Sequence, residues 1–178
     1  HIYNEKTGKY RYRGKEVSRE QLIEVYEDLV KCYPLKTIED PVQEDDFEGF
    51  SEITRRLGIQ IVGDDLFVSN LKRLMKGVQN RSANSILLKV NQVGTLTEAL
   101  ETASYANKNG YSIIVSERSG QTEDTWLADL TVAINAGQIK NGTPTRSERV
   151  AQFNQLLRIE EELWGAARYA GRDYRVPH

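Results

Sequence analysis

The sequence predicts an α/β fold in which parallel strands alternate with covering helices, and three observations support this prediction. Short strand-like runs alternate along the chain with segments whose apolar residues recur at three- and four-residue spacing. Helix-start signals open several of those segments, and a charged residue stands near the end of each strand-like run. Such alternation is typical of βα units that form a sheet covered by helices.

Five strands are predicted, at residues 35–40, 59–65, 85–91, 112–118 and 137–142. Six amphipathic helices are predicted around them, at residues 18–33, 45–57, 70–78, 95–107, 122–135 and 145–163. The first helix opens at Ser18 on S-R-E-Q, which is a capping box, and the fourth stops near Gly110, a residue that often ends helices. The chain therefore contains about five βα units.

The charged residues near the C-terminal ends of the predicted strands are Glu39, Asp64, Lys89, Arg118 and Lys140. In a (β/α)₈ barrel these strand ends line one mouth, so the five side chains are expected to converge there. Salt bridges that only close the top of the barrel are the structural alternative. Recurrence of charge at equivalent places in successive units favours a functional mouth.

The residue types at this mouth indicate metal-assisted proton transfer. Glu39 and Asp64 offer the hard oxygen ligands that suit Mg²⁺, with water and substrate completing the shell. Lys89 lies on an apolar strand, and burial beside a second cation, Lys140, favours the uncharged amine that a general base needs.

Arg118, Ser119 and Gly120 form a sequence that can bind an anion, because a guanidinium group binds phosphate or carboxylate in bidentate fashion. A metal, a base and an anion clamp together indicate proton abstraction next to a carboxylate, with the metal stabilising an enediolate.

Composition narrows the class of protein. A chain of 178 residues with 39% hydrophobic residues can bury one substantial core, so residues 1–178 are predicted to form a single domain. The net charge of −2 argues against a nucleic-acid partner, and no apolar run approaches the length of a membrane span. The single cysteine, Cys32, excludes an internal disulfide, is expected to be partly buried, and favours a reducing compartment, hence the cytoplasm.

Several segments of the chain resemble the enolase family. Residues 86–99, I-L-L-K-V-N-Q-V-G-T-L-T-E-A, are similar to the enolase signature segment. The stretches I-E-D-P, G-D-D-L, R-S-G-Q-T-E-D, G-Q-I-K and N-Q-L-L-R-I-E-E-E-L also resemble enolase, in the family's order and spacing. The resemblance covers nearly the whole chain and implies the C-terminal part of an enolase-type TIM barrel.

The resemblance implies a lyase, phosphopyruvate hydratase, which interconverts 2-phosphoglycerate and phosphoenolpyruvate in glycolysis with Mg²⁺. It implies Mg²⁺ ligands at Glu39 and Asp64, the proton-abstracting base at Lys89, phosphate contacts at Arg118 and Ser119, and a substrate-carboxylate contact at Lys140. These roles agree with those that the residue types indicate.

Three positions depart from the family's pattern. Glu117 stands where the family has a histidine that contacts the substrate, Gln121 replaces a glutamate, and Asn141 replaces a threonine. Glu117 is therefore predicted at a substrate-binding position, where it is expected to pair with Arg118 and neutralise the anion clamp.

Two hypotheses follow. The chain is the C-terminal part of a working enolase, or it is a pseudoenzyme, an enolase-derived scaffold that kept the fold and lost the chemistry. The family carries an N-terminal α+β domain and the first barrel strands ahead of the region that this chain resembles. The expected partners are accordingly the rest of an enolase barrel or a partner chain, in a homodimer or a larger assembly.

Overall fold

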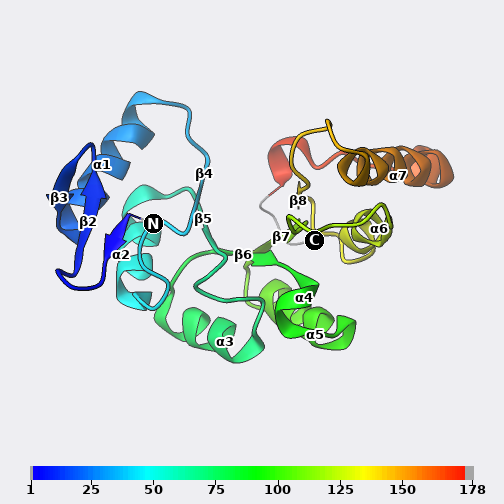
Figure 1. Cartoon of the computed structure of the whole chain (residues 1–178). Coiled ribbons are helices and arrows are strands. Elements are labelled where there is room, and N and C mark those ends of the chain that lie inside the picture. The colour runs from blue at the N-terminus through cyan, green and yellow to red at the C-terminus, as the bar shows by residue number, and fades with distance from the viewer. Residues whose placement is uncertain (1, 175–178) are drawn as a thin grey trace.

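The computed structural model describes residues 2–174, and its centre is a five-stranded sheet in the order β4-β5-β6-β7-β8. The strands are β4 Thr37–Glu39, β5 Gln60–Gly63, β6 Ser85–Leu88, β7 Ser112–Ser116 and β8 Ile139–Lys140. Every neighbouring pair is parallel. The sheet curls into an open arc with the helices on its outer side, as in part of a barrel wall (Figure 1). The predicted α/β fold is confirmed.

The six predicted helices are all present. They are α1 Arg19–Cys32, α2 Phe47–Leu57, α3 Leu71–Asn80, α5 Leu96–Lys108, α6 Trp126–Ala133 and α7 Ser147–Leu163. The capping box of α1 forms as expected: the Ser18 hydroxyl accepts from the Gln21 N–H at 3.2 Å, and the Gln21 side chain accepts from the Ser18 N–H at 2.9 Å. This reciprocal bonding explains why the helix begins directly after Ser18.

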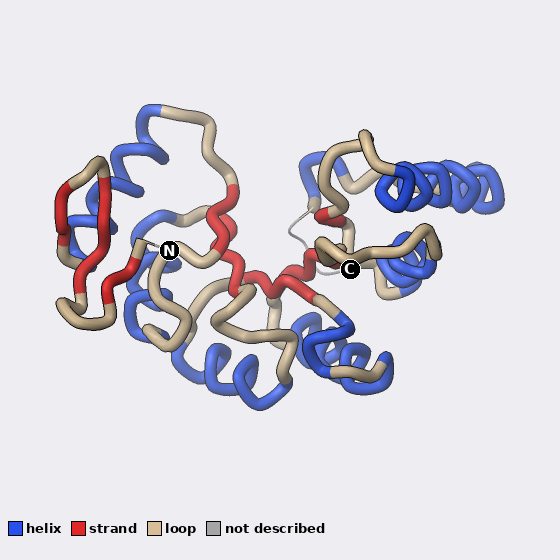
Figure 2. The backbone as a smooth tube through the Cα atoms, in the orientation of Figure 1, coloured by secondary structure: helices blue, strands red, loops and turns tan. Residues whose placement is uncertain are grey.

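The strands end earlier than the sequence predicts. The third predicted strand stops at Leu88 because Lys89 caps a short helix, α4 Val90–Val93. The fourth stops at Ser116, so Glu117 and Arg118 begin the loop that follows β7. Asp64, Lys89 and Arg118 therefore lie just beyond the strands, whereas Glu39 and Lys140 are the last residues of β4 and β8. Figure 2 shows the loops that follow the strands.

An antiparallel meander at the start of the chain was not predicted. It comprises β1 Tyr3–Asn4, β2 Lys9–Tyr12 and β3 Lys15–Val17, and Tyr10 from its middle strand joins the main hydrophobic core. Two 3₁₀ helices, η1 Trp164–Ala166 and η2 Gly171–Asp173, follow α7. The expected partial burial of Cys32 is wrong: the thiol is exposed, because it ends α1 while Leu22 and Ile23 bury that helix's other face.

Residues alternate between the two faces of the sheet. Ile113 and Val115 of β7 pack into the core beneath the helices, whereas Ile114 joins a separate small cluster with Val62 and Leu87. That second cluster lines the concave face, because alternate residues of a strand point to opposite sides. The same alternation continues to the strand ends and decides which side chains reach the mouth. Within residues 2–174, no helix combines the length and the apolar character needed to cross a membrane.

Candidate active site

The structure brings four of the predicted site residues together at the C-terminal ends of the strands. Lys89, directly after β6, forms an ion pair with Asp64, directly after β5. Lys140 at the end of β8 donates to both carboxylate oxygens of Glu39 at the end of β4, at 2.7 and 2.8 Å. Since β4 and β8 are the outer strands of the sheet, this ion pair joins side chains from its two edges across the mouth.

The two ion pairs differ in their exposure to solvent. The side chains of Lys89 and Asp64 are 14% and 10% exposed, whereas those of Lys140 and Glu39 are 51% and 28% exposed. Each of the two lysines is paired with a carboxylate: Lys89 with Asp64 and Lys140 with Glu39. The deeper pair is shielded from water, and the outer pair stands at the entrance of the mouth.

Two side chains that the sequence analysis missed hold the deeper pair in place. Ser69 accepts from the Lys89 backbone N–H at 2.8 Å and donates to the Gln92 side chain at 2.6 Å. Gln92 in turn donates to the Asp64 carboxylate at 3.3 Å. Ser69 lies in a loop far from Lys89 in the sequence, and no spacing rule relates it to the strand ends.

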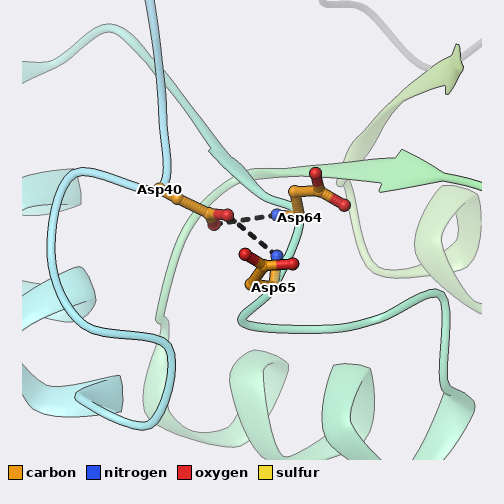
Figure 3. Close-up of side chains that lie close together, drawn as sticks. All are labelled: Asp40, Asp64 and Asp65. Carbon is orange, nitrogen blue, oxygen red and sulfur yellow. Dashed lines mark hydrogen bonds between the residues drawn. The ribbon is translucent and has the colours of Figure 1, made fainter. Parts of the chain in front are cut away.

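An acidic cluster of Asp40, Asp64 and Asp65 lies beside the deeper ion pair, with one oxygen of each within 4.8 Å of the others. The Asp40 carboxylate accepts from the backbone N–H groups of Asp64 at 2.9 Å and of Asp65 at 2.8 Å, as Figure 3 shows. Burial raises the pKa of Asp40 to about 6. Asp40 thus holds the turn after β5 in place, and the Asp64 carboxylate points away from Asp40 (Figure 3) and contacts Lys89 and Gln92.

Arg118 and Ser119 lie in the loop that follows β7, and both are exposed. The Arg118 guanidinium donates to the Asn91 amide oxygen at 3.3 Å, so its partner there is a neutral group. A guanidinium with an uncharged partner at the entrance of the mouth retains the charge that an anionic ligand requires.

Glu117 does not pair with Arg118, so that expectation is wrong. Its Oε1 atom lies 3.1 Å from Nε of Arg149, which belongs to α7. The reason is the direction of the side chain. Glu117 is an even number of residues from Val115, which faces the helices, and its backbone N–H donates to the Lys140 carbonyl at 3.0 Å as a continuation of the ladder.

Comparison with known proteins identifies the family to which this chain is similar. The family profile described as "Enolase, C-terminal TIM barrel domain" matches residues 1–178. The protein named "Enolase" of Methanococcus maripaludis strain S2 is 57% identical over 177 residues, which are 99% of this chain and 41% of that protein. Those of Methanocaldococcus jannaschii and Pyrococcus furiosus are each 58% identical, over 97% and 98% of this chain and 40% and 41% of their own lengths. The chain therefore spans about two fifths of these relatives.

Proposed function

Because the chain belongs to the enolase family through its C-terminal TIM-barrel domain, we propose that it acts, within a complete enolase, in the Mg²⁺-dependent interconversion of 2-phosphoglycerate and phosphoenolpyruvate. This is a lyase reaction of glycolysis, and we place it in the cytoplasm. The observation that carries the proposal is the convergence of Lys89, Asp64, Glu39 and Lys140 at the mouth as matched acids and bases.

Lys89 is the proposed general base. Its position at the base of the mouth, shielded from water beside Asp64, suits the removal of a proton from the substrate carbon next to the carboxylate. Accepting that proton requires that Lys89 first release its own proton and its contact with Asp64. Ser69 holds the backbone of Lys89 during this exchange, which keeps the amine in a defined direction.

Substrate anions have separate binding groups in this proposal. Lys140 stands at the entrance and binds the substrate carboxylate, and Arg118 with Ser119 binds the phosphate. Arg118 supports this role because its hydrogen-bond partner is the neutral side chain of Asn91, so a phosphate need not displace a carboxylate.

The residues of the mouth fit Mg²⁺. Glu39 and Asp64 supply hard carboxylate oxygens, and in this structure the ammonium groups of Lys140 and Lys89 lie against them, as a cation would. When bound, Mg²⁺ supplies the positive charge that stabilises negative charge developing on the substrate carboxylate. Glu39 and Asp64 would hold the ion, and Lys140 and Lys89 would then contact the substrate in place of these carboxylates.

A second candidate function is that of an enolase-derived scaffold without catalysis, and Glu117 is the observation that favours it. A carboxylate where the family has a substrate-contacting histidine adds negative charge near an anionic substrate, which disfavours binding. In that case the chain serves as an interaction protein in a larger assembly.

An assay of the complete protein separates the two functions. Formation of phosphoenolpyruvate from 2-phosphoglycerate is followed with Mg²⁺ and again after chelation with EDTA. We expect turnover that requires Mg²⁺ and returns when the ion is restored. Absence of both turnover and 2-phosphoglycerate binding in a folded, Mg²⁺-saturated protein would overturn the enzyme proposal and favour the scaffold.

A further inference from the structure

Glu117 belongs to the side of the sheet that faces the helices. Ile113 and Val115 of the same strand are buried in the core beneath the helices, while Ile114 between them joins the concave cluster. The Glu117 N–H donates to the Lys140 carbonyl, which extends the β7–β8 ladder beyond the last residue of β7. The alternation of the strand therefore directs the Glu117 side chain toward α7 rather than into the mouth.

Arg149 in α7 meets this carboxylate in a confined space. The Glu117 and Arg149 side chains are 11% and 20% exposed, and Oε1 and Nε are 3.1 Å apart. The Arg149 carbonyl accepts from the Asn141 side chain at 2.8 Å, which ties α7 to the segment after β8. A Cβ atom at Gly142 would lie 2.6 Å from Glu117 Oε1 and 2.8 Å from Arg149 Nε, so only glycine leaves room for the pair.

Charge, rather than hydrogen-bond geometry, holds the two side chains together. The Arg149 Nε–H does not point at the carboxylate, and the second carboxylate oxygen of Glu117 is buried without a hydrogen-bond partner in the described part of the chain. A carboxylate with so little access to water requires a positive charge nearby. Arg149 supplies it, and the next cation along the loop, Arg118, stays exposed with a neutral partner.

We propose that Arg149 is a positioning residue: it holds the Glu117 carboxylate against α7 and so keeps Arg118 available to the phosphate group of the substrate. The inference rests on the proposed function for the identity of that phosphate. It explains why the Arg118 charge is not neutralised although Glu117, an acid, is its neighbour in the sequence. Loss of the Arg149 charge frees Glu117 to turn toward Arg118.

The test compares the complete protein with Arg149→Met, Arg149→Met combined with Glu117→Gln, and the control Arg56→Met. Arg56 is a matched control because its side chain is also 20% exposed and pairs with Glu27, at the α1–α2 contact away from the mouth. One readout is the dissociation constant for 2-phosphoglycerate with Mg²⁺. The other is the rate at which phenylglyoxal modifies Arg118, followed by peptide mass spectrometry, which does not depend on the proposed function.

Arg149→Met is expected to weaken 2-phosphoglycerate binding and to slow Arg118 modification, each on the order of tenfold, as for one altered close charge contact. The added Glu117→Gln change is expected to restore both values to within about threefold, and Arg56→Met to alter neither. Restoration by removal of the acid is the result that a merely structural role of Arg149 would not produce. Arg149→Gln, which keeps a hydrogen-bond donor beside the carboxylate, replaces Arg149→Met if the latter does not fold.

Failure of the proposed function and failure of the inference about Arg149 give different results. If the unaltered protein does not bind 2-phosphoglycerate, the proposed function fails, and the phenylglyoxal rates still decide the role of Arg149. If Arg118 reacts at the same rate in the unaltered protein and in Arg149→Met, or if the double variant does not recover, the inference is overturned while the proposed function stands.

Discussion

The two ends of the five-stranded sheet carry polar side chains of different kinds. At the N-terminal end, neutral side chains form one network across all five strands, and its members are Thr37, Gln60, Ser85, Ser112 and Gln138. At the C-terminal end, the side chains at equivalent places are charged and form separate ion pairs. The two sets lie on the same concave face, because the strand residues of each are an even number of positions apart.

Gln60 is the centre of the neutral network and is fully buried. Its amide donates to Ser112 Oγ at 2.9 Å and to Gln138 Oε1 at 2.7 Å, and its carbonyl accepts from Thr37 at 2.7 Å. A network whose donors and acceptors satisfy one another stabilises a single arrangement and leaves nothing for a ligand. At the mouth, the Lys140–Glu39 pair is partly exposed, so its partners can be exchanged for a ligand at small cost. The N-terminal ends of the strands thus carry side chains that stabilise the fold, and the C-terminal ends carry the side chains that are proposed to bind a ligand.

The largest expected effect comes from a change at the mouth. Lys89→Met removes the proposed base and should lower the turnover of 2-phosphoglycerate by about 10²- to 10⁴-fold, the usual contribution of general base catalysis. Steady-state kinetics of the complete protein measure it. Arg56→Met, far from the mouth, is the control and should leave turnover unchanged. An equal loss of turnover in both variants would show that the effect is structural. The two ends of the sheet would then not differ in their roles.

A change at the opposite end should affect stability instead. Gln60→Leu removes the side-chain partner of the buried Ser112 hydroxyl and of the partly buried Thr37 and Gln138 side chains, and we expect a loss of about 3 kcal/mol in unfolding free energy. Denaturant titration measures this loss, and the exposed Gln79→Leu is the control. The folded fraction should keep its turnover, and a selective loss of turnover would contradict the separation of roles.

A smaller effect is expected beside the mouth, where Gly142 adjoins the Glu117–Arg149 pair. Gly142 has φ +67° and Gly58 has φ +62°, but only Gly142 has atoms that an added Cβ would touch at less than 3 Å. Gly58→Ala should cost about 1 kcal/mol through backbone strain. Gly142→Ala should cost about 1–2 kcal/mol more through crowding. Equal losses by thermal unfolding would mean that the ion pair moves aside freely.

The smallest effect concerns a hydrogen bond between uncharged groups at the C-terminal end of the sheet. The Tyr26 hydroxyl donates to the Pro41 carbonyl, just after β4, at 2.8 Å, and burial raises the pKa of Tyr26 to about 12. An unfolded tyrosine loses its proton near pH 10, so the unfolded state binds fewer protons between pH 10 and 12 and stability falls as pH rises through that window.

Tyr26→Phe should therefore lower the unfolding free energy by about 1 kcal/mol at neutral pH. Its further loss of stability between pH 10 and 12 should be smaller than that of the unaltered protein. Tyr33→Phe, at an exposed position, is the control and should match the unaltered protein. Burial also raises the pKa of Tyr10 and of Tyr111, so the alkaline loss is reduced rather than abolished. A pH profile of Tyr26→Phe that parallels the unaltered protein would contradict this role of Tyr26.

The sequence by itself determined the order of the elements and the family. Alternating strand and helix patterns are local properties of the chain, so they predicted five parallel strands in sequence order and six helices, which the structure confirms. Charges at the strand ends predicted a common mouth, because parallel strands end at one edge. The strands of the meander at residues 3–17 are two to four residues long, too short for a periodic pattern to reveal them.

Tertiary structure alone decided which charge meets which. Lys89 pairs with Asp64 and Lys140 with Glu39, although the residue types allow other pairings. Glu117 pairs with Arg149 of a later helix and not with its neighbour Arg118, because the Glu117 backbone continues the β7–β8 ladder and its side chain follows Val115 toward the helices. Side-chain direction depends on where each strand stops and on which helix covers that face. Those are properties of the packed sheet, and no short stretch of the chain contains them.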